Sequence, residues 1–129
     1  MSNNQKHIIY NKYELACLIA KGITLEELHA KHDYSNITDM SWLFAGVITN
    51  KFTKMIKIDT SNVITMAYMF VDCSYLEYVP DLDTSKVVEM DYMFYACYRI
   101  NDINPYNYKL CNFSLLDNEF IKGKYPELY

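Results

Sequence analysis

Apolar side chains recur through the middle of the chain at fixed intervals, in three copies of one pattern. The copies start at Asp33, Asp59 and Asp83, and the serine two residues further on stands where a helix N-cap is expected. Within each copy the apolar residues fall at i, i+3, i+6, i+7 and i+10, which predicts one stripe of a short helix. These residues are Ile37, Met40, Leu43, Phe44 and Val47; Val63, Met66, Met69, Phe70 and Cys73; Val87, Met90, Met93, Phe94 and Cys97.

A second apolar series, at threefold spacing, follows each predicted helix. Short runs of this kind between turn residues predict one short strand per copy, and Pro80 places the end of one strand at Val79. Copies spaced by 26 and 24 residues are typical of a solenoid, in which each unit buries its apolar face against its neighbours. The series comprises Phe52, Met55 and Ile58; Leu76, Val79 and Leu82; Ile100, Ile103 and Tyr106.

Helical patterns flank the three copies. Residues 11–21 predict a short helix that Gly22 ends, and Thr24 begins a second helix with a TLEE capping box. After Tyr106 the pattern degrades, although residues 107–121 keep helical spacing. We therefore expect a single domain, with an N-terminal helical cap over residues 1–32, three repeats over 33–106, and a C-terminal cap and tail over 107–129.

The second and third copies, DTSNVITMAYMFVDC and DTSKVVEMDYMFYAC, identify a family resemblance. The pattern resembles the BspA-like bacterial surface-protein repeat, a relative of the leucine-rich repeats, over about residues 33–106. The resemblance implies protein recognition without catalysis or cofactor. The expected fold class is α/β: a short leucine-rich-repeat-like solenoid with one short helix and one short strand per repeat and helical caps at both ends. Family members are typically long surface or secreted arrays used in adhesion, whereas this chain is short.

Charge is distributed unevenly along the 129 residues, whose formal net charge is −4. Residues 58–105 carry eight acidic and two basic side chains, a net charge of −6, whereas residues 1–57 carry a net charge of +2. The acidic block disfavours direct binding of nucleic acid and favours a basic partner. An apolar fraction of 51% with only three glycines and three prolines predicts a chain that is folded nearly throughout.

The residues that could carry chemistry have simpler interpretations. Cys73 and Cys97 occupy the position of Val47 in the first copy, which indicates small apolar core residues rather than a disulfide or metal pair. His29 and His32 could share a helix face as metal ligands, but a solvated helix end is the preferred interpretation. Catalytic and phosphate-binding motifs are absent from the sequence, so we expect neither an enzyme nor a cofactor.

Tyrosine is abundant, with 13 residues, and combines rigid apolar area with a polar tip. The Met-aromatic stripes MAYMF and DYMFY are assigned mostly to the core. Several tyrosines lie instead near the predicted helix-to-strand transitions, beside carboxylates. The alternative is that these tyrosines cover the core. The candidate partner-binding surface comprises Tyr75, Glu77, Tyr78, Asp81, Tyr95, Tyr98 and Asp102.

Together these features predict a non-enzymatic protein–protein interaction module. The sharpest hypothesis is a small intracellular inhibitor, such as a phage-encoded anti-defence protein, that binds a basic or nucleic-acid-binding surface of its target. The alternatives are a relative or fragment of a surface adhesion protein, and an intracellular scaffold or homo-oligomer. The N-terminal sequence shows neither a signal peptide nor a membrane span, so the expected location is the cytoplasm, or the cell surface if an export signal precedes it.

Overall fold

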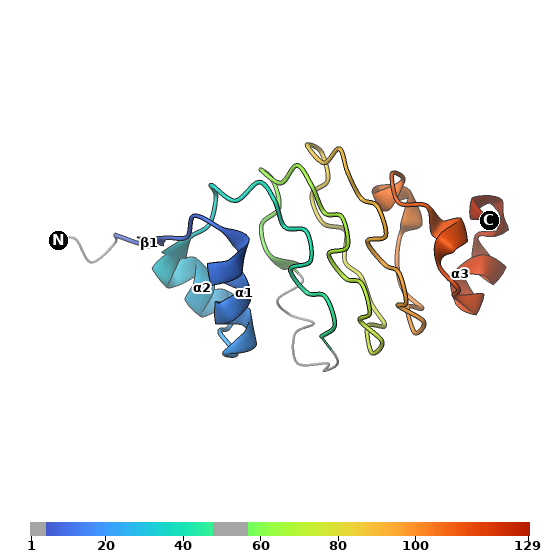
Figure 1. Ribbon diagram of the computed structural model, residues 1–129, viewed down its shortest axis with the longest axis horizontal. Coiled ribbons are helices and arrows are strands. Elements are labelled where there is room, and N and C mark those ends of the chain that lie inside the picture. The colour runs from blue at the N-terminus through green and yellow to red at the C-terminus, as the bar shows by residue number, and fades with distance from the viewer. Residues whose placement is uncertain (1–4, 48–56) are drawn as a thin grey trace.

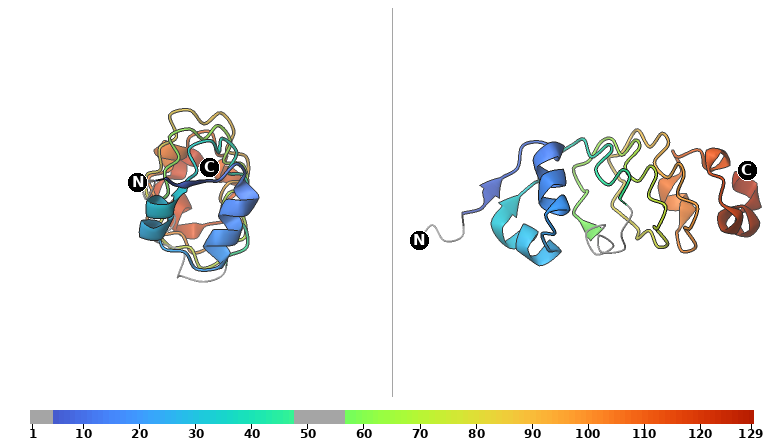
Figure 2. Two further views of the ribbon diagram at one scale, coloured as in Figure 1. Left: turned by 90° about the vertical axis from the view of Figure 1, so that its left-hand side faces the viewer. Right: turned by 60° about the horizontal axis from the view of Figure 1, so that its bottom comes forward.

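The computed structural model describes residues 5–47 and 57–129. Loops of coil occupy the middle of an elongated molecule, and helices lie at both of its ends (Figure 1). Viewed from the N-terminal end, the coil loops lie one behind another (Figure 2). Phe52 and Met55, which belong to the apolar series predicted after the first copy, lie outside the described residues.

The first predicted helix is confirmed as α1, Lys12–Ala20. Its N-cap residue is Asn11, whose side chain accepts hydrogen bonds from two amides of the first turn and so satisfies donors that have no partner within the helix. Gly22 follows with a φ of 87°, a left-handed conformation that glycine adopts without steric penalty. The chain can therefore turn directly into the next element.

The second predicted helix is confirmed as α2, Leu25–Lys31, and begins where Thr24 accepts a hydrogen bond from the Glu27 amide at 3.0 Å. The strands β1, His7–Ile8, and β2, His32–Asp33, form a parallel two-stranded sheet. Strand β2 follows α2 without a break.

The C-terminal region is built from short helical pieces: the 3₁₀ helices η3, Pro105–Tyr108, η4, Phe113–Leu115, and η5, Pro126–Leu128, and the α-helix α3, Glu119–Lys124. Of the residues predicted to give residues 107–121 helical spacing, Phe113 and Leu116 are buried, whereas Phe120 is exposed.

The predicted leucine-rich-repeat-like solenoid, with one helix and one strand per repeat, is wrong. The described residues contain three short α-helices and one sheet of two two-residue strands, and none of these α-helices lies in the repeated segments. Apart from Lys57, which is 3₁₀-helical, the described parts of residues 34–104 are turns and coil, with three isolated bridges: Asp39 to Thr65, Thr65 to Glu89 and Tyr78 to Asp102.

The physical reason why the repeated segments do not form helices begins at the start of each copy. The serine predicted as an N-cap instead closes an Asx turn: the side-chain oxygen of Asp33, Asp59 or Asp83 accepts the amide of the serine two residues on, at 2.9 Å in each case. Downstream, alternate amides of one copy donate to carbonyls of the next. Met40, Trp42, Phe44 and Gly46 donate to Thr65, Ala67, Met69 and Val71; Met66, Tyr68, Phe70 and Asp72 donate to Glu89, Asp91, Met93 and Tyr95.

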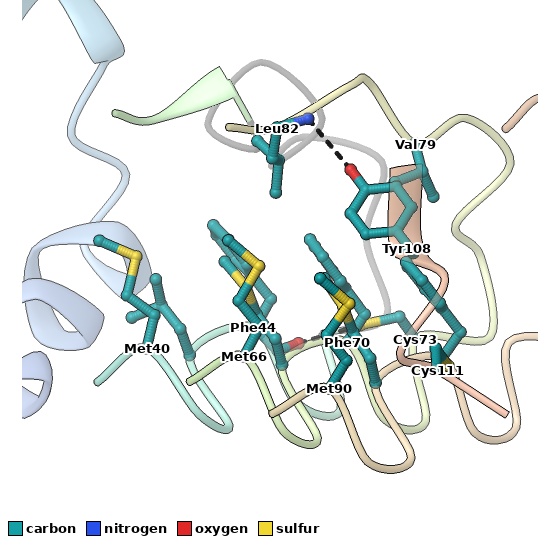
Figure 3. Close-up of a cluster of buried hydrophobic side chains, with 14 of the residues drawn as sticks. Met40, Phe44, Met66, Phe70, Cys73, Val79, Leu82, Met90, Tyr108 and Cys111 are labelled. Carbon is teal, nitrogen blue, oxygen red and sulfur yellow. Dashed lines mark hydrogen bonds between the residues drawn. The ribbon is translucent and has the colours of Figure 1, made fainter. Parts of the chain in front are cut away.

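The predicted apolar stripe is nevertheless the core. Its members are buried apart from Val47, which is half-buried. Phe44, Phe70 and Phe94 form a column of nearly parallel rings, with centroids 5.3 Å and 5.6 Å apart. Figure 3 shows Met40, Met66 and Met90 packed along the same cluster.

The described members of the second apolar series are also buried, except for Tyr106. Leu76, Val79, Leu82, Ile100 and Ile103 belong to the core, but Tyr106 is 54% exposed and its hydroxyl donates to a carboxylate oxygen of Glu127. The ring of Tyr108 is buried instead, and its hydroxyl accepts the Leu82 amide at 3.1 Å and donates to the Pro80 carbonyl (Figure 3).

Candidate protein-binding surface

Four of the seven predicted surface residues meet where the coil after the second copy runs beside the coil after the third. Tyr78 and Asp102 form an isolated parallel bridge, in which the Val79 amide donates to the Asp102 carbonyl at 2.9 Å. The Glu77 carbonyl accepts the amides of Asn101 and Asp102. The backbone therefore holds these residues in register. Glu77, Tyr78 and Asp102 are exposed, as is Tyr75 nearby in the chain.

Tyr75 carries a cation on its ring: the Arg99 guanidinium lies 4.9 Å from the ring centroid. This side-chain contact joins the coil after the second copy to the coil after the third. The Tyr78–Asp102 bridge joins the same two segments through the backbone. The contact with Arg99 also shows that the ring can receive a guanidinium in water-exposed surroundings. We call Tyr75, Glu77, Tyr78 and Asp102 the tyrosine–acid cluster.

Tyr98 and Asp81 are exposed, but no hydrogen bond or ring contact joins their side chains to this cluster. The Tyr98 carbonyl lies 3.4 Å from the Asn118 side-chain amide, so the backbone of Tyr98 contacts the C-terminal region. Asp81 lines an open pocket with Asp59, Asp83 and Lys57. The pKa of Asp83 lies below its usual range because its carboxylate accepts hydrogen bonds from Ser85.

Tyr95 lies outside the tyrosine–acid cluster. Its ring packs edge-on against Tyr92, with centroids 5.8 Å apart. Tyr92 in turn stacks on Tyr68 at 5.3 Å, and Tyr68 stacks on Trp42 at 4.3 Å. We call Trp42, Tyr68 and Tyr92 the aromatic column.

The aromatic column was missed because Tyr68 and Tyr92 belong to the Met-aromatic stripes assigned to the core, and Trp42 was given no role. Trp42 is instead 53% exposed and Tyr92 41% exposed, while Tyr68 between them is half-buried. One signal in the sequence could have found it: the residue two positions before each core phenylalanine is aromatic in all three copies.

The cysteines of the repeats are core residues, as predicted. Cys73 and Cys97 are fully buried free thiols, and they donate to the carbonyls of Phe44 and Phe70 at 3.0 Å and 2.9 Å. The hydrogen bond with Cys73, together with burial, raises the pKa of the Cys97 thiol. Burial raises the pKa of Cys111 to about 11. Cys97 and Cys111 are therefore protonated and weakly nucleophilic at neutral pH.

The histidines do not form a ligand set. His29 hydrogen bonds to the Tyr34 hydroxyl at 2.7 Å, and the His32 ring packs edge-on against His7. Within residues 5–47 and 57–129, no three His, Cys, Asp or Glu side chains gather closely enough to hold a metal ion. In the same residues no helix is both long enough and apolar enough to cross a bilayer.

The structure thus defines a small protein with a continuous sulfur- and phenylalanine-rich core and a tyrosine- and acid-rich exterior. The family described as "Mycoplasma protein of unknown function, DUF285" matches residues 16–122, and the chain belongs to this family. The match agrees with a bacterial family of surface-repeat type, but it does not establish the BspA-like leucine-rich repeat. Comparison with curated proteins and with solved structures gave no match.

Proposed function

We propose that this protein is a non-enzymatic protein-binding module whose tyrosine–acid cluster contacts a basic surface of its partner. The observation that carries the proposal is the exposure of two tyrosines and two carboxylates on adjacent, backbone-paired segments. Rigid tyrosines supply contact area at a small loss of side-chain entropy, and the paired backbone reduces the ordering that binding requires.

Electrostatics supports a basic partner. The ion pairs recorded among the described residues are His7–Glu14 and Lys12–Asp39, and both lie outside residues 58–105. The carboxylates of the acidic block are therefore free to attract an approaching cationic surface, which raises the association rate and makes it sensitive to salt.

The finer proposal is an inhibitor that occludes a basic groove of its target, such as the nucleic-acid groove of a host defence enzyme. Its support is the acidic block of residues 58–105. The match to a family of surface-repeat type favours a second candidate, a surface module that binds a partner outside the cell. Labelling intact cells with an antibody against this protein separates the two, because only the surface module is accessible without permeabilisation.

The proposal is tested by affinity capture from the native host with the wild-type chain and a Tyr75→Ala, Tyr78→Ala double variant. We expect one protein to be captured at low salt, retained less at high salt, and lost by the double variant. A Tyr10→Ala, Tyr13→Ala variant is the matched control, because these tyrosines are 70% and 71% exposed and lie far from the cluster in the sequence.

A second variant tests how much the carboxylate charges of the tyrosine–acid cluster contribute to binding. Glu77→Gln with Asp102→Asn keeps the side-chain shapes, and it is expected to weaken capture most at low salt because the long-range attraction is lost. Capture that is unchanged in both variants would show that the partner binds another face. Light scattering on the isolated protein checks the homo-oligomer alternative, which predicts a mass above that of one chain.

A further inference from the structure

The aromatic column has a backbone conformation that its residues do not favour. Trp42, Tyr68 and Tyr92 have φ angles of 66°, 60° and 55°. A left-handed conformation costs an L-residue on the order of 1 kcal/mol and is uncommon for a bulky side chain. Each copy has another left-handed position four residues on, occupied by Gly46, Asp72 and Ala96. At that second position the chain uses small or polar residues, whereas at the first it keeps an aromatic ring in every copy.

Packing of the interior does not account for these rings. The core already has its own aromatic column, Phe44, Phe70 and Phe94, and these rings are buried. The outer column leaves about half of the Trp42 side chain and two-fifths of the Tyr92 side chain in water. Strain combined with exposure is a pattern that points to function, because neither feature stabilises the folded chain.

The column takes one ring from each of the three copies, and its rings stack pairwise. The ring planes of Trp42 and Tyr68 are within 3° of parallel, and those of Tyr68 and Tyr92 are within 18°. The rings are spaced by 4.3 Å and 5.3 Å, so the row spans the length of roughly three residues of an extended chain. Among the described residues, the Trp42 indole N–H and the Tyr68 and Tyr92 hydroxyls donate no hydrogen bond. An extended peptide could therefore accept these donors.

The charged side chains near Tyr92 determine which kind of peptide the aromatic column can bind. Glu89 and Asp91 precede Tyr92 in the chain, and the Asp91 carbonyl accepts the Tyr68 amide at 2.9 Å. Both side chains are exposed, and neither forms an ion pair within the described part of the chain. Carboxylates beside aromatic rings select a cationic side chain, arginine in particular.

We infer that the aromatic column, with the carboxylates around Tyr92, is a docking surface for an extended, arginine-containing segment of a partner protein. This inference rests on the proposed function, since it adds a second contact to a protein-binding module. The rings of Trp42 and Tyr92 contact the peptide, and Glu89 and Asp91 hold its guanidinium groups. The tyrosine–acid cluster is a separate surface, so an experiment can contradict binding at one surface without contradicting binding at the other.

The experiment uses the full chain and a synthetic peptide of alternating arginine and alanine, with a glutamate–alanine peptide as the charge control. Trp42 is the only tryptophan, so its fluorescence reports directly on the column. We expect a saturable change in Trp42 emission with the arginine peptide and none with the glutamate peptide. Absence of a saturable change with the arginine peptide, or an equal response to both peptides, would overturn the inference without any variant.

Two variants separate recognition from a structural role. Tyr92→Gly removes the ring, relieves the left-handed strain and leaves the net charge unchanged; we expect binding to weaken about tenfold while thermal stability is kept or increased. Tyr92→Phe keeps the ring and should bind within about threefold of the wild type. Unchanged binding by Tyr92→Gly, or a loss of both its folding and its binding, would assign the column to structure alone. The Tyr10→Ala, Tyr13→Ala variant, which removes two exposed tyrosines outside both surfaces, should bind the peptide as the wild type does.

Discussion

Tyr108 shows how one buried hydroxyl joins two distant segments. Its O–H donates to the Pro80 carbonyl and accepts the Leu82 amide, so a turn containing proline keeps both polar groups satisfied. Burial raises the pKa of Tyr108 to about 12. The fold thus favours the neutral phenol, and the unfolded chain releases this proton first as the pH rises.

At the scale of this residue we predict a specific alkaline destabilisation. The contribution of Tyr108 is fully present below pH 10, its pKa when unfolded, and is lost as the pH rises towards 12, by about 2 to 3 kcal/mol in total. Tyr108→Phe lacks this titration, although it should lower stability at pH 8 by about 1 to 3 kcal/mol through two lost hydrogen bonds. Urea unfolding at pH 8 and pH 11.5 should show the difference between wild type and variant shrinking. A constant difference would contradict the prediction.

At the scale of elements, α3 is attached through its N-cap. The side chain of Asn118 is buried; its oxygen accepts the Ile121 amide at 2.9 Å, and its NH₂ group donates to the Ile100 carbonyl at 2.9 Å and lies within 3.3 Å of the Cys97 carbonyl. One residue therefore begins the helix and connects it to the third copy.

Asn118→Ala should lower the free energy of unfolding by about 2 to 4 kcal/mol, because it removes a cap and leaves buried carbonyls without a donor. Asn112→Ala is the matched control: Asn112 caps η4 from an exposed position, so its loss should cost no more than about 1 kcal/mol. Urea denaturation of both variants measures the contrast. Equal effects would mean that the contacts of Asn118 with the third copy contribute nothing.

At the scale of the whole molecule, the phenylalanine column runs through all three copies and continues into the C-terminal region, where Phe94 contacts Tyr108 and Phe113. Phe70 lies in the middle of this column with no exposed surface. Its ring is therefore in contact with neighbours on both faces, and the coil loops around it depend on that packing.

Phe70→Ala should destabilise the protein by about 3 to 5 kcal/mol, since a buried ring is lost and a cavity remains. Phe70→Leu fills part of the cavity and should recover part of this loss. Denaturant unfolding followed by near-ultraviolet circular dichroism tests both variants. A loss below about 1 kcal/mol for Phe70→Ala would show that the loops do not depend on the column.

Sequence alone determined most of the core and where α1 and α2 begin, because burial largely follows side-chain polarity and capping depends on neighbours only three residues apart. It also indicated a tyrosine- and acid-rich exterior, although Tyr95 belongs to a different cluster from Tyr78. Only the tertiary structure decided the backbone of the repeated segments. Their amides bond to carbonyls about 24 residues away, and Trp42, Tyr68 and Tyr92 adopt left-handed φ angles, so neither local periodicity nor intrinsic propensity could reveal the coil loops or the aromatic column.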